Sequence, residues 1–342
     1  MFEISHPARV HAYRRLIERL RSNGFEVICL VTEKDLTVHL MDGYGIEYRL
    51  IGRNRNTFLG KALEQIRSIV VGIIQVARFK PVMLVGGASL VLGIPAILFR
   101  IHYLSISDTE HASLTWALTE RLISHIVTPS MYKRDHGAKH TRLDTFKELA
   151  YLHADSFKPD PSVLEKLDLK PDSFILMRLI SWSAQHDRGQ QGFSRSHLIS
   201  TVRQLEQYGR VLISSEEELP DELRPNAVDI DPIHIHSVLY YASLYFGESG
   251  TMATESAVLG TPAVRVSSLA RKLGNSVELN KKYGLLHYYE EESEAMRKSI
   301  EILQSPTSKT DYKNKAELLM REKVDLSDYL FKYILNIVSK NG

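Results

Sequence analysis

Residues 244–265 of the chain read LYFGESGTMATESAVLGTPAVR, and this stretch decides the fold class. An apolar run leads into the small-residue turn GESGT, a helical pattern follows directly, and GTP separates that helix from a second apolar run. Strands that alternate with helices at this spacing form crossover units and a parallel sheet. We therefore predict an α/β domain in which this segment is one strand–helix–strand unit.

The turn in this segment has the chemistry of an anion site. Small residues let a ligand approach the backbone closely, and the N-terminus of a helix offers unpaired N–H groups and positive dipole character to a pyrophosphate. The residues expected to hold that group are Gly247, Ser249, Gly250 and Thr251. Glu255 lies one turn further on the same helical face, where its carboxylate could accept hydrogen bonds from ribose hydroxyls. The alternative is that glycine and serine only form a tight turn and cap the helix.

The same alternation extends through both halves of the chain. In the first half, strand-like runs and helical patterns alternate at 2–5, 8–22, 26–32, 46–52, 59–78, 112–124 and 125–130. In the second half they alternate at 173–181, 195–208, 210–215, 233–242, 243–247, 251–259 and 262–266. Two doubly wound sheets of this kind predict a bilobed α/β protein that binds ligands beyond the carboxyl ends of its strands.

Domain boundaries follow from where this rhythm is interrupted. A polar stretch with three prolines at 159, 161 and 171 reads as a linker. We predict an N-terminal Rossmann-like domain at 1–155, a linker at 156–171, a C-terminal Rossmann-like domain at 172–324 and an amphipathic helix at 325–342. We expect that last helix to pack back on the first domain.

Composition excludes several classes of protein. The 342 residues exceed what one hydrophobic core usually serves, and 44% apolar and 25% charged residues are ordinary for a globular protein. The 43 Lys and Arg are nearly balanced by 41 Asp and Glu, so charge gives no argument for a nucleic-acid partner. One cysteine, Cys29, can form no internal disulfide, and the first residues show no signal peptide. We therefore expect a cytoplasmic protein.

Residues 81–99, PVMLVGGASLVLGIPAILF, form an uncharged run close to the minimum length for crossing a bilayer. The Gly86-Gly87 pair and the GIP sequence at 93–95 divide the run into three pieces. We interpret these as a strand, a short helix and a second strand at 96–99, because buried parallel strands are apolar on both faces.

Segment 244–265 resembles the nucleotide-binding motif of glycosyltransferase-B proteins. It is similar to that of the cell-wall N-acetylglucosaminyltransferase and to that of UDP-N-acetylglucosamine 2-epimerases. Further stretches resemble an uncharacterised prokaryotic family of glycosyltransferase-B-like proteins, a domain of unknown function, over nearly the whole chain: HPARVH at 6–11, QHDRGQQG at 185–192 and GRVLISSEEELP at 209–220. The resemblance implies two Rossmann-like domains facing a cleft, a UDP-sugar ligand held without metal, and ribose binding by Glu255.

The resemblance to the epimerases points to two acidic residues. Glu110 and Glu120 occupy places similar to those of the epimerase glutamates, and such side chains suit the removal and return of a proton. The chain departs from the epimerases at Gly86-Gly87, where they carry an aspartate, and the spacing between the two glutamates is shorter. Ser107-x-x-Glu110 is also a capping box, and Glu120 on a solvated helical face is the structural alternative.

Two histidines and two further residues complete the candidates. His186 follows the first strand of the second half and resembles the epimerase His-Arg loop, with Arg188 as a phosphate partner. In a transferase, His11, Asp108 or Glu110 would be the general base for the acceptor. The alternative for His11 is helix capping and surface exposure. No cysteine pair and no His-Glu-x-x-His pattern occurs, so we expect no metal.

Residues 49–80 carry seven Lys and Arg against Glu64 alone, and seven minus one gives a local net charge of +6. The apolar run IVVGIIQVA lies among them at 69–77. A basic, apolar helix can lie on an anionic membrane surface, so we predict peripheral membrane contact here. The alternative is a core-facing helix with solvated charges.

These observations predict a nucleotide-sugar-dependent glycosyltransferase of surface-glycan or lipid-linked glycan assembly. The C-terminal domain would hold a UDP-sugar donor and the N-terminal domain a glycan or lipid-linked acceptor. Two alternatives stay open: a UDP-N-acetylhexosamine 2-epimerase-like enzyme that uses Glu110, Glu120 and His186, and a non-catalytic nucleotide-sugar-binding or scaffold protein. A homodimer also stays open.

Overall fold

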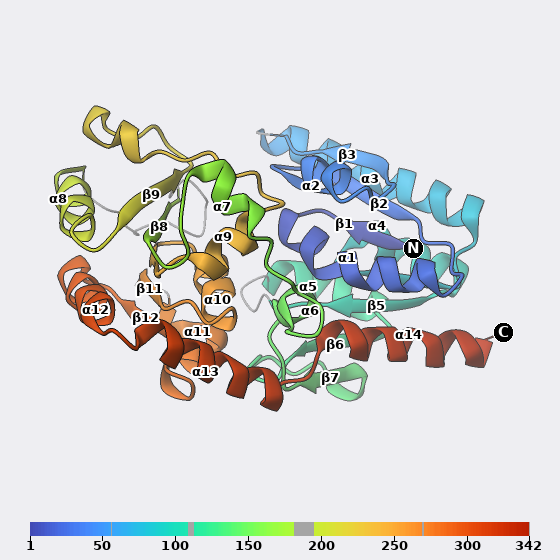
Figure 1. Ribbon diagram of the computed structural model, residues 1–342. Helices are drawn as coiled ribbons and strands as arrows, with labels where there is room; N and C mark the ends of the chain where they lie inside the picture. Colours follow the sequence, from blue (N-terminus) through green and yellow to red (C-terminus); the bar gives the residue numbers. More distant parts are fainter. Residues whose placement is uncertain (56, 109–112, 181–194, 269, 342) are drawn as a thin grey trace. The chain divides into compact units, whose positions relative to one another are not determined.

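The computed structural model describes residues 1–341 apart from 56, 109–112, 181–194 and 269. The chain divides into two compact units. The first unit consists of Met1–His153 and Lys323–Gly342, and the second of Ala154–Glu322. Each unit is built around its own sheet (Figure 1).

The first unit contains a seven-stranded sheet in the order β3-β2-β1-β4-β5-β6-β7. Its strands are β1 (Phe2–Ile4), β2 (Cys29–Glu33), β3 (Arg49–Arg53), β4 (Met83–Gly86), β5 (His102–Ile106), β6 (His125–Pro129) and β7 (His140–Leu143). All of these pairings are parallel. The strand order reverses between β1 and β4, and the crevice at such a switch point is where open α/β sheets bind ligands.

Helices cover this sheet because each presents an apolar face to it. They are α1 (Pro7–Ser22), α2 (Thr37–Gly43), α3 (Phe58–Phe79), α4 (Leu90–Phe99), α5 (Ser113–Thr119), α6 (Leu149–Leu152) and α14 (Leu326–Asn341). Buried side chains from β2, β4, β5 and β6 form a core with residues of α4 and with Trp116 of α5. Because this core fixes the helices, it also fixes the strand-to-helix turns at the carboxyl edge of the sheet.

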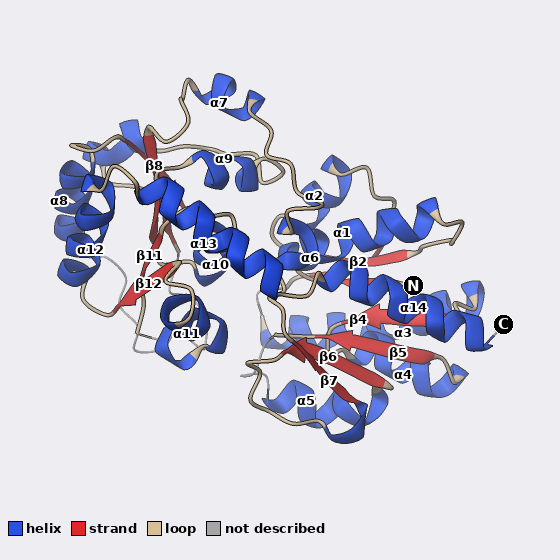
Figure 2. Ribbon diagram, turned by 60° about the horizontal axis from the view of Figure 1, so that its bottom comes forward, coloured by secondary structure: helices blue, strands red, loops and turns tan. Residues whose placement is uncertain are grey.

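Helix α14 returns from the end of the chain to the first unit and packs against α1 (Figure 2). Two ion pairs join these elements: Arg15 binds Asp325, and Arg19 Nη1 lies 2.8 Å from Asp328 Oδ1. The buried residues Leu330 and Ile334 supply the apolar part of α14.

The second unit contains a five-stranded parallel sheet in the order β12-β11-β10-β8-β9. Its strands are β8 (Phe174–Leu179), β9 (Arg210–Ser215), β10 (Leu244–Gly247), β11 (Ala263–Val266) and β12 (Leu286–Tyr289). Its helices are α7 (Ser162–Leu167), α8 (Arg195–Leu205), α9 (Ile235–Tyr241), α10 (Gly250–Val258), α11 (Gly274–Lys281), α12 (Glu292–Gln304) and α13 (Ser308–Glu322). The strand order reverses between β8 and β10, which is the switch point of this sheet.

The predicted fold class, two doubly wound parallel sheets in an α/β protein, is confirmed. Two local expectations differ from the structure. The expected strand at 96–99 is the second half of α4, which Ser89 starts by accepting a hydrogen bond from Val91 N at 3.1 Å. A short apolar run cannot be distinguished from a buried helix by periodicity alone. The stretch 156–171, expected as a linker, contains α7, whose Val163 and Leu164 are buried.

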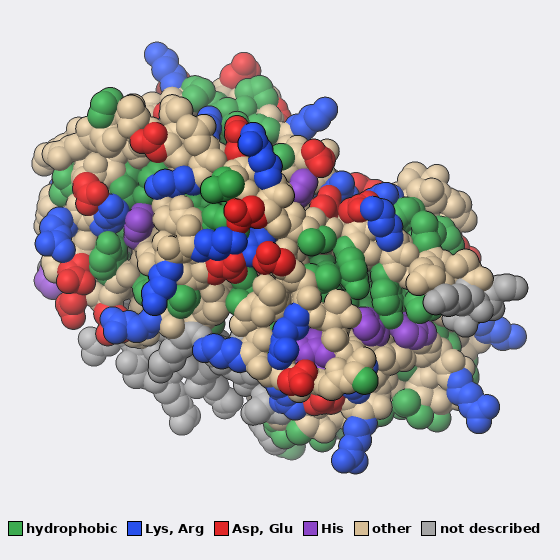
Figure 3. Space-filling view, turned by 90° about the horizontal axis from the view of Figure 1, so that it is seen from below, with side chains coloured by type: hydrophobic (Ala, Val, Ile, Leu, Met, Phe, Trp, Pro, Cys, Tyr) green, Lys and Arg blue, Asp and Glu red, His purple; other side chains and the backbone are tan. Residues whose placement is uncertain are grey.

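Within the described residues, no helix combines the length and the apolar character needed to span a bilayer. On the face drawn in Figure 3, basic and acidic side chains lie interspersed. That mixture agrees with the near balance of 43 basic and 41 acidic residues in the sequence.

Candidate functional site

The turn after β10 lies at the switch point of the second sheet. Strand β10 pairs with β8, and Gly247 sits opposite Arg178 in that pairing. A Cβ atom at position 247 would overlap the backbone of Arg178, so only glycine lets the two strands approach this closely here. The next residue, Glu248, ties the turn to β8, because its Oε2 accepts a hydrogen bond from Ile180 N at 3.0 Å.

Helix α10 begins directly after this turn. Ser249 is its N-cap, and the Ser249 hydroxyl accepts a hydrogen bond from Met252 N at 3.4 Å. Tyr245 fixes the position of this cap residue, because the Tyr245 hydroxyl donates a hydrogen bond to Ser249 O at 3.1 Å. Thr251, in the first turn, is exposed. The capping role that we gave as the alternative for Ser249 is therefore present, and it leaves other N–H groups of the first turn directed outward for an anion.

Arg265 of β11 supplies a positive charge beneath this helix N-terminus. Its side chain is only 7% exposed, and its Nε donates to Glu248 O at 3.0 Å. Its Nη1 is buried and has no hydrogen-bond partner in the described structure. A Cβ added to Gly250 would lie 2.9 Å from that nitrogen, so the guanidinium packs against the first residue of α10.

A buried guanidinium without a full set of partners is costly, and such a group is a functional candidate. Burial lowers the pKa of Arg265, and the neighbouring Tyr245 and Glu248 act in the opposite direction. Arginine stays charged throughout the working range of a protein. The sequence analysis missed this residue. The signal was a single charged residue inside the apolar strand 262–266.

Glu255 lies on α10, as the sequence predicts, and is buried at 4% exposure. Its Oε1 lies 3.0 Å from Nε2 of His236, a residue of α9 that is also buried. The ring of Phe157 contacts His236 edge-on, with ring centroids 6.4 Å apart. His236 therefore orients the Glu255 carboxylate, a role that the sequence analysis did not predict, because α9 and α10 are brought together only by the fold.

The transferase base candidates lie in the first unit. Asp108 is bound by Lys147, whose Nζ lies 2.5 Å from Asp108 Oδ2. Burial would raise the pKa of Asp108, but the charge and hydrogen bond of Lys147 hold it below its usual value. His11 is 8% exposed, not on the surface: its Nδ1 lies 3.1 Å from Tyr44 OH, and its ring stacks on Tyr151. This packing gives His11 an interior position.

Glu120 is engaged in a charged cluster. Its Oε2 accepts a hydrogen bond from Arg134 Nη2 at 2.7 Å, and its Oε1 lies 3.1 Å from His136 Nδ1. Its pKa is lowered, because these hydrogen bonds and charges outweigh the effect of burial. The predicted site residues Glu110, His186 and Arg188 lie outside the described residues. Among the described residues, no group of three or more His, Cys, Asp and Glu could hold a metal ion.

Comparison with known proteins gives a family and a set of structural neighbours. A family model described as "Protein of unknown function (DUF354)" matches residues 1–335. An uncharacterized protein of Methanocaldococcus jannaschii, MJ0665, is 21% identical over 273 residues, which cover 77% of this chain and 80% of that protein.

Three solved structures share the fold. UDP-GlcNAc 2-epimerase from Neisseria meningitidis, bound to UDP-GlcNAc, superposes with a TM-score of 0.66 at 13% identity and covers 99% of both chains. MnaA of S. aureus, solved with UDP, gives a TM-score of 0.68 at 13% identity and covers 99% of this chain and 97% of its own. The spinosyn forosaminyltransferase SpnP gives 0.65 at 14% identity and covers 98% and 99%. These likenesses confirm the expected resemblance and show the fold of nucleotide-sugar enzymes.

Proposed function

This chain belongs to the DUF354 family, and from the geometry of its site and the fold it shares with UDP-GlcNAc 2-epimerases and a glycosyltransferase we propose that it is a glycosyltransferase with a UDP-sugar as donor. The observation that carries the proposal is the turn from Gly247 to Thr251, at the switch point of the second sheet, with the buried charge of Arg265 beneath it. A helix N-terminus and a fixed cation together suit the diphosphate of a nucleotide sugar.

In this proposal, each site residue has a separate role. Backbone N–H groups at Gly250 and Thr251 bind the phosphate oxygens. Arg265 Nη1, which has no hydrogen-bond partner among the described residues, donates a charge-assisted hydrogen bond to them. Glu255 accepts hydrogen bonds from the ribose hydroxyls, and His236 holds its carboxylate in place. MnaA of S. aureus was solved with UDP and the epimerase of Neisseria meningitidis with UDP-GlcNAc, which supports a uridine nucleotide here.

The same groups would also promote sugar transfer. In this reaction the bond between the anomeric carbon and the diphosphate oxygen breaks, a bond to the acceptor oxygen forms, and the acceptor proton passes to a base. Negative charge then grows on the departing UDP. A cation and helix dipole fixed beside the diphosphate stabilise that charge more than the ground state, which lowers the barrier.

Transfer is favoured over epimerisation by the condition of Glu120. Its carboxylate is bound by Arg134 and His136, and its pKa is lowered, so it is a poor group for exchanging protons with a substrate. The resemblance to the epimerases also implies a carboxylate at the place where this chain has Gly86-Gly87.

The test measures consumption of UDP-sugars and release of UDP, with and without candidate acceptors. A transferase releases UDP rapidly only when an acceptor is present. Consumption of UDP-N-acetylglucosamine without any acceptor would instead establish the epimerase. Tight UDP binding without turnover under any acceptor would establish a binding or scaffold protein.

Membrane contact is part of the proposal, through an exposed apolar stripe on α3. Its members are Leu59, Leu63, Ile66, Val70 and Ile74, between 49% and 73% exposed. Their spacing of three and four residues places them on one side of the helix. Basic residues of the same helix flank the stripe, at Lys61, Arg67 and Arg78. Apolar and cationic groups arranged in this way suit the surface of an anionic bilayer, at the cytoplasmic side.

A further inference from the structure

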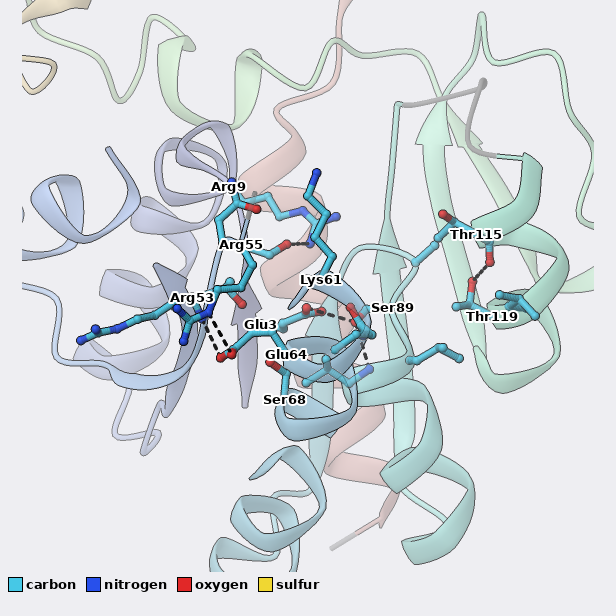
Figure 4. Close-up of a pocket in the computed structure, with 18 residues that line it drawn as sticks. Glu3, Arg9, Arg53, Arg55, Lys61, Glu64, Ser68, Ser89, Thr115 and Thr119 are labelled. Carbon is cyan, nitrogen blue, oxygen red and sulfur yellow. Dashed lines mark hydrogen bonds and ion pairs between the residues drawn. The ribbon is translucent and has the colours of Figure 1, made fainter. Parts of the chain in front are cut away.

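The first unit contains a pocket with a volume of about 490 Å³. It lies at the carboxyl ends of the strands, where β1 and β4 meet (Figure 4). Glu3 and Ser5 enter it from β1 and the turn that follows, and Ser89 enters it from the turn after β4. This is the switch point of the seven-stranded sheet, so topology alone marks it as a place for a ligand.

Positive groups dominate the lining of this pocket. Four cations, Arg9, Arg53, Arg55 and Lys61, face two carboxylates, Glu3 and Glu64. Figure 4 draws the cations on α1, on the end of β3, in the loop after it and on α3, with the Arg53 side chain directed away from the other labelled residues. Arg53 is paired with Glu33 and Arg55 with Glu64. Arg9 and Lys61 then remain against Glu3, and two minus one leaves a net charge of +1, which favours an anionic ligand.

The turn after β4 leaves space for the Arg9 side chain in the pocket. A Cβ at Gly87 would coincide with the Arg9 guanidinium, so the two-glycine turn after β4 makes room for this side chain. Arg9 Nη1 donates to Ser5 Oγ at 2.9 Å. The Arg9 guanidinium therefore occupies the space that a side chain at position 87 would need.

Two helix N-termini also open into the pocket. Arg9 lies in the first turn of α1, and Ser89, Leu90 and Val91 form the start of α4. These helices have 16 and 10 residues, long enough to present positive dipole character to the pocket. Helix α3 contributes Lys61 from its own first turns.

One carboxylate oxygen in the pocket, Oε2 of Glu3, has no hydrogen-bond donor in the described structure. Glu3 is 4% exposed, its Oε1 accepts a hydrogen bond from Ser89 Oγ at 3.0 Å, and its Oε2 is buried with no partner in the described structure. Burying an acceptor without a donor is unfavourable. A ligand hydroxyl would satisfy Oε2, whereas a second anion would be repelled by it.

We propose that this pocket binds a ligand that carries both a phosphate group and a hydroxyl group. The phosphate lies among Arg9, Lys61 and the helix N-termini, and the hydroxyl donates to Glu3 Oε2. In the proposed transfer reaction this ligand is the acceptor, a phosphorylated alcohol. Only this identification of the ligand as the acceptor rests on the proposed function.

The test is calorimetric titration of the full-length protein with two matched probes, glycerol 3-phosphate and propyl phosphate, which differ in their hydroxyl groups. We expect glycerol 3-phosphate to bind the wild type with a Kd of about 1 mM or tighter, and at least tenfold more tightly than propyl phosphate. Lys61→Glu is expected to weaken both probes at least tenfold. Lys332→Glu reverses an exposed charge on α14, outside the pocket, and is expected to change neither by more than twofold.

Glu3→Gln gives the sharpest readout, because it separates the two groups of the ligand. It removes a negative charge near the phosphate, so propyl phosphate should bind as well or better, while the advantage of glycerol 3-phosphate over propyl phosphate should shrink at least fivefold. An unchanged ratio in Glu3→Gln would overturn the role of Glu3. Failure of both probes to bind the wild type, or equal losses in Lys61→Glu and Lys332→Glu, would overturn the site.

Vesicles distinguish a lipid from a soluble source of the phosphate. If phosphatidylglycerol in phosphatidylcholine vesicles, whose headgroup carries a phosphate and free hydroxyls, binds wild type at least tenfold better than phosphatidic acid, which has no free alcohol, and Glu3→Gln loses that preference, the phosphate belongs to a lipid headgroup. If the vesicles do not discriminate but glycerol 3-phosphate does, it belongs to a soluble compound. UDP titrated in the same experiments reports on the second unit separately, so failure of the donor site and of this pocket are told apart.

Discussion

Arg265 is the residue on which the donor site depends most. Replacing it with methionine removes a charge-assisted hydrogen bond to the diphosphate, worth roughly 1.5–3 kcal/mol, while the buried volume changes little. We expect UDP to bind Arg265→Met about 10- to 100-fold more weakly than wild type. Calorimetric titration measures this difference. Arg224→Met, in which the lost arginine pairs with Glu218 and Asp221 on the surface, is the matched control. Equal UDP affinity in all three proteins would contradict the assignment.

Glu3 links function to stability through its pKa. Burial raises the pKa of this carboxyl above its ordinary value of 4.5, and the charge of Arg9 and the hydrogen bond from Ser89 offset only part of the shift. An acid with a raised folded-state pKa binds more protons folded than unfolded, so it destabilises the protein as pH rises above the unfolded pKa. Glu3→Gln should therefore be more stable than wild type at pH 8.

This stability difference should depend on pH in a defined way. It should be nearly absent at pH 4 and grow as pH rises through the folded pKa of Glu3. Tm measured from pH 4 to pH 8 provides the check, with the exposed Glu18→Gln as control. A Tm difference that stays constant across this range, or a variant less stable than wild type at pH 8, would show that the buried, ionised Glu3 carboxylate does not destabilise the protein.

Residue-level roles that depend on packing could not be predicted from the sequence. The turn 247–251 was predicted because glycine, serine and a following helical pattern are local signals. Arg265 acquires its role only when β11 lies beside β10, and Glu3 only when Ser89, 86 positions away, reaches it. His236 was likewise noticed only as the start of a helix, since its contact with Glu255 joins two different helices.

At the scale of elements, apolar periodicity predicted several long helices and the central strands, but it did not predict α12 and α13, which have 13 and 15 residues. The expectations at 8–22 and 59–78 correspond to α1 and α3, and that at 243–247 corresponds to β10, which lies between β11 and β8. The sequence analysis missed β7 and β12, each of four residues at the edge of its sheet. An edge strand pairs on one side only and need not be apolar, and HTRL and LHYY give no alternating pattern.

The apolar stripe of α3 makes a testable prediction at this scale. Full burial of one leucine or isoleucine side chain is worth roughly 1.5–3 kcal/mol, so exchanging Leu63 and Ile66 for serine should weaken binding to anionic vesicles at least tenfold. Cosedimentation with phosphatidylglycerol vesicles at low salt measures this loss. Leu318→Ser removes a leucine that is 52% exposed on α13, outside the stripe, and should leave binding unchanged.

Salt provides the second check on the stripe. Because flanking cations contribute electrostatically, vesicle binding of the wild type should fall as ionic strength rises. Wild-type protein that ignores anionic vesicles at low salt would show that the stripe serves another purpose.

At the scale of the whole molecule, both sheets bear their candidate sites at their switch points. The first sheet reverses its order between β1 and β4 and carries the pocket of Glu3 and Arg9 there. The second reverses between β8 and β10 and carries the turn of α10. Each site combines helix N-termini with a buried or half-buried arginine. One such site in each unit suits a protein that binds two phosphate-containing ligands.

The central claim is that the start of α10 binds the diphosphate of a nucleotide sugar, and Thr251 tests it most directly. Thr251 is exposed in the first turn, where a glutamate stabilises a helix through its dipole but repels a diphosphate. We predict that calorimetric titration with UDP gives binding to wild type and to the neutral Thr251→Gln within about threefold. We predict binding at least tenfold weaker to Thr251→Glu, a loss of about 1.4 kcal/mol, with no decrease in Tm. Equal UDP affinity in the Glu and Gln variants, or no UDP binding by wild type, would contradict the account.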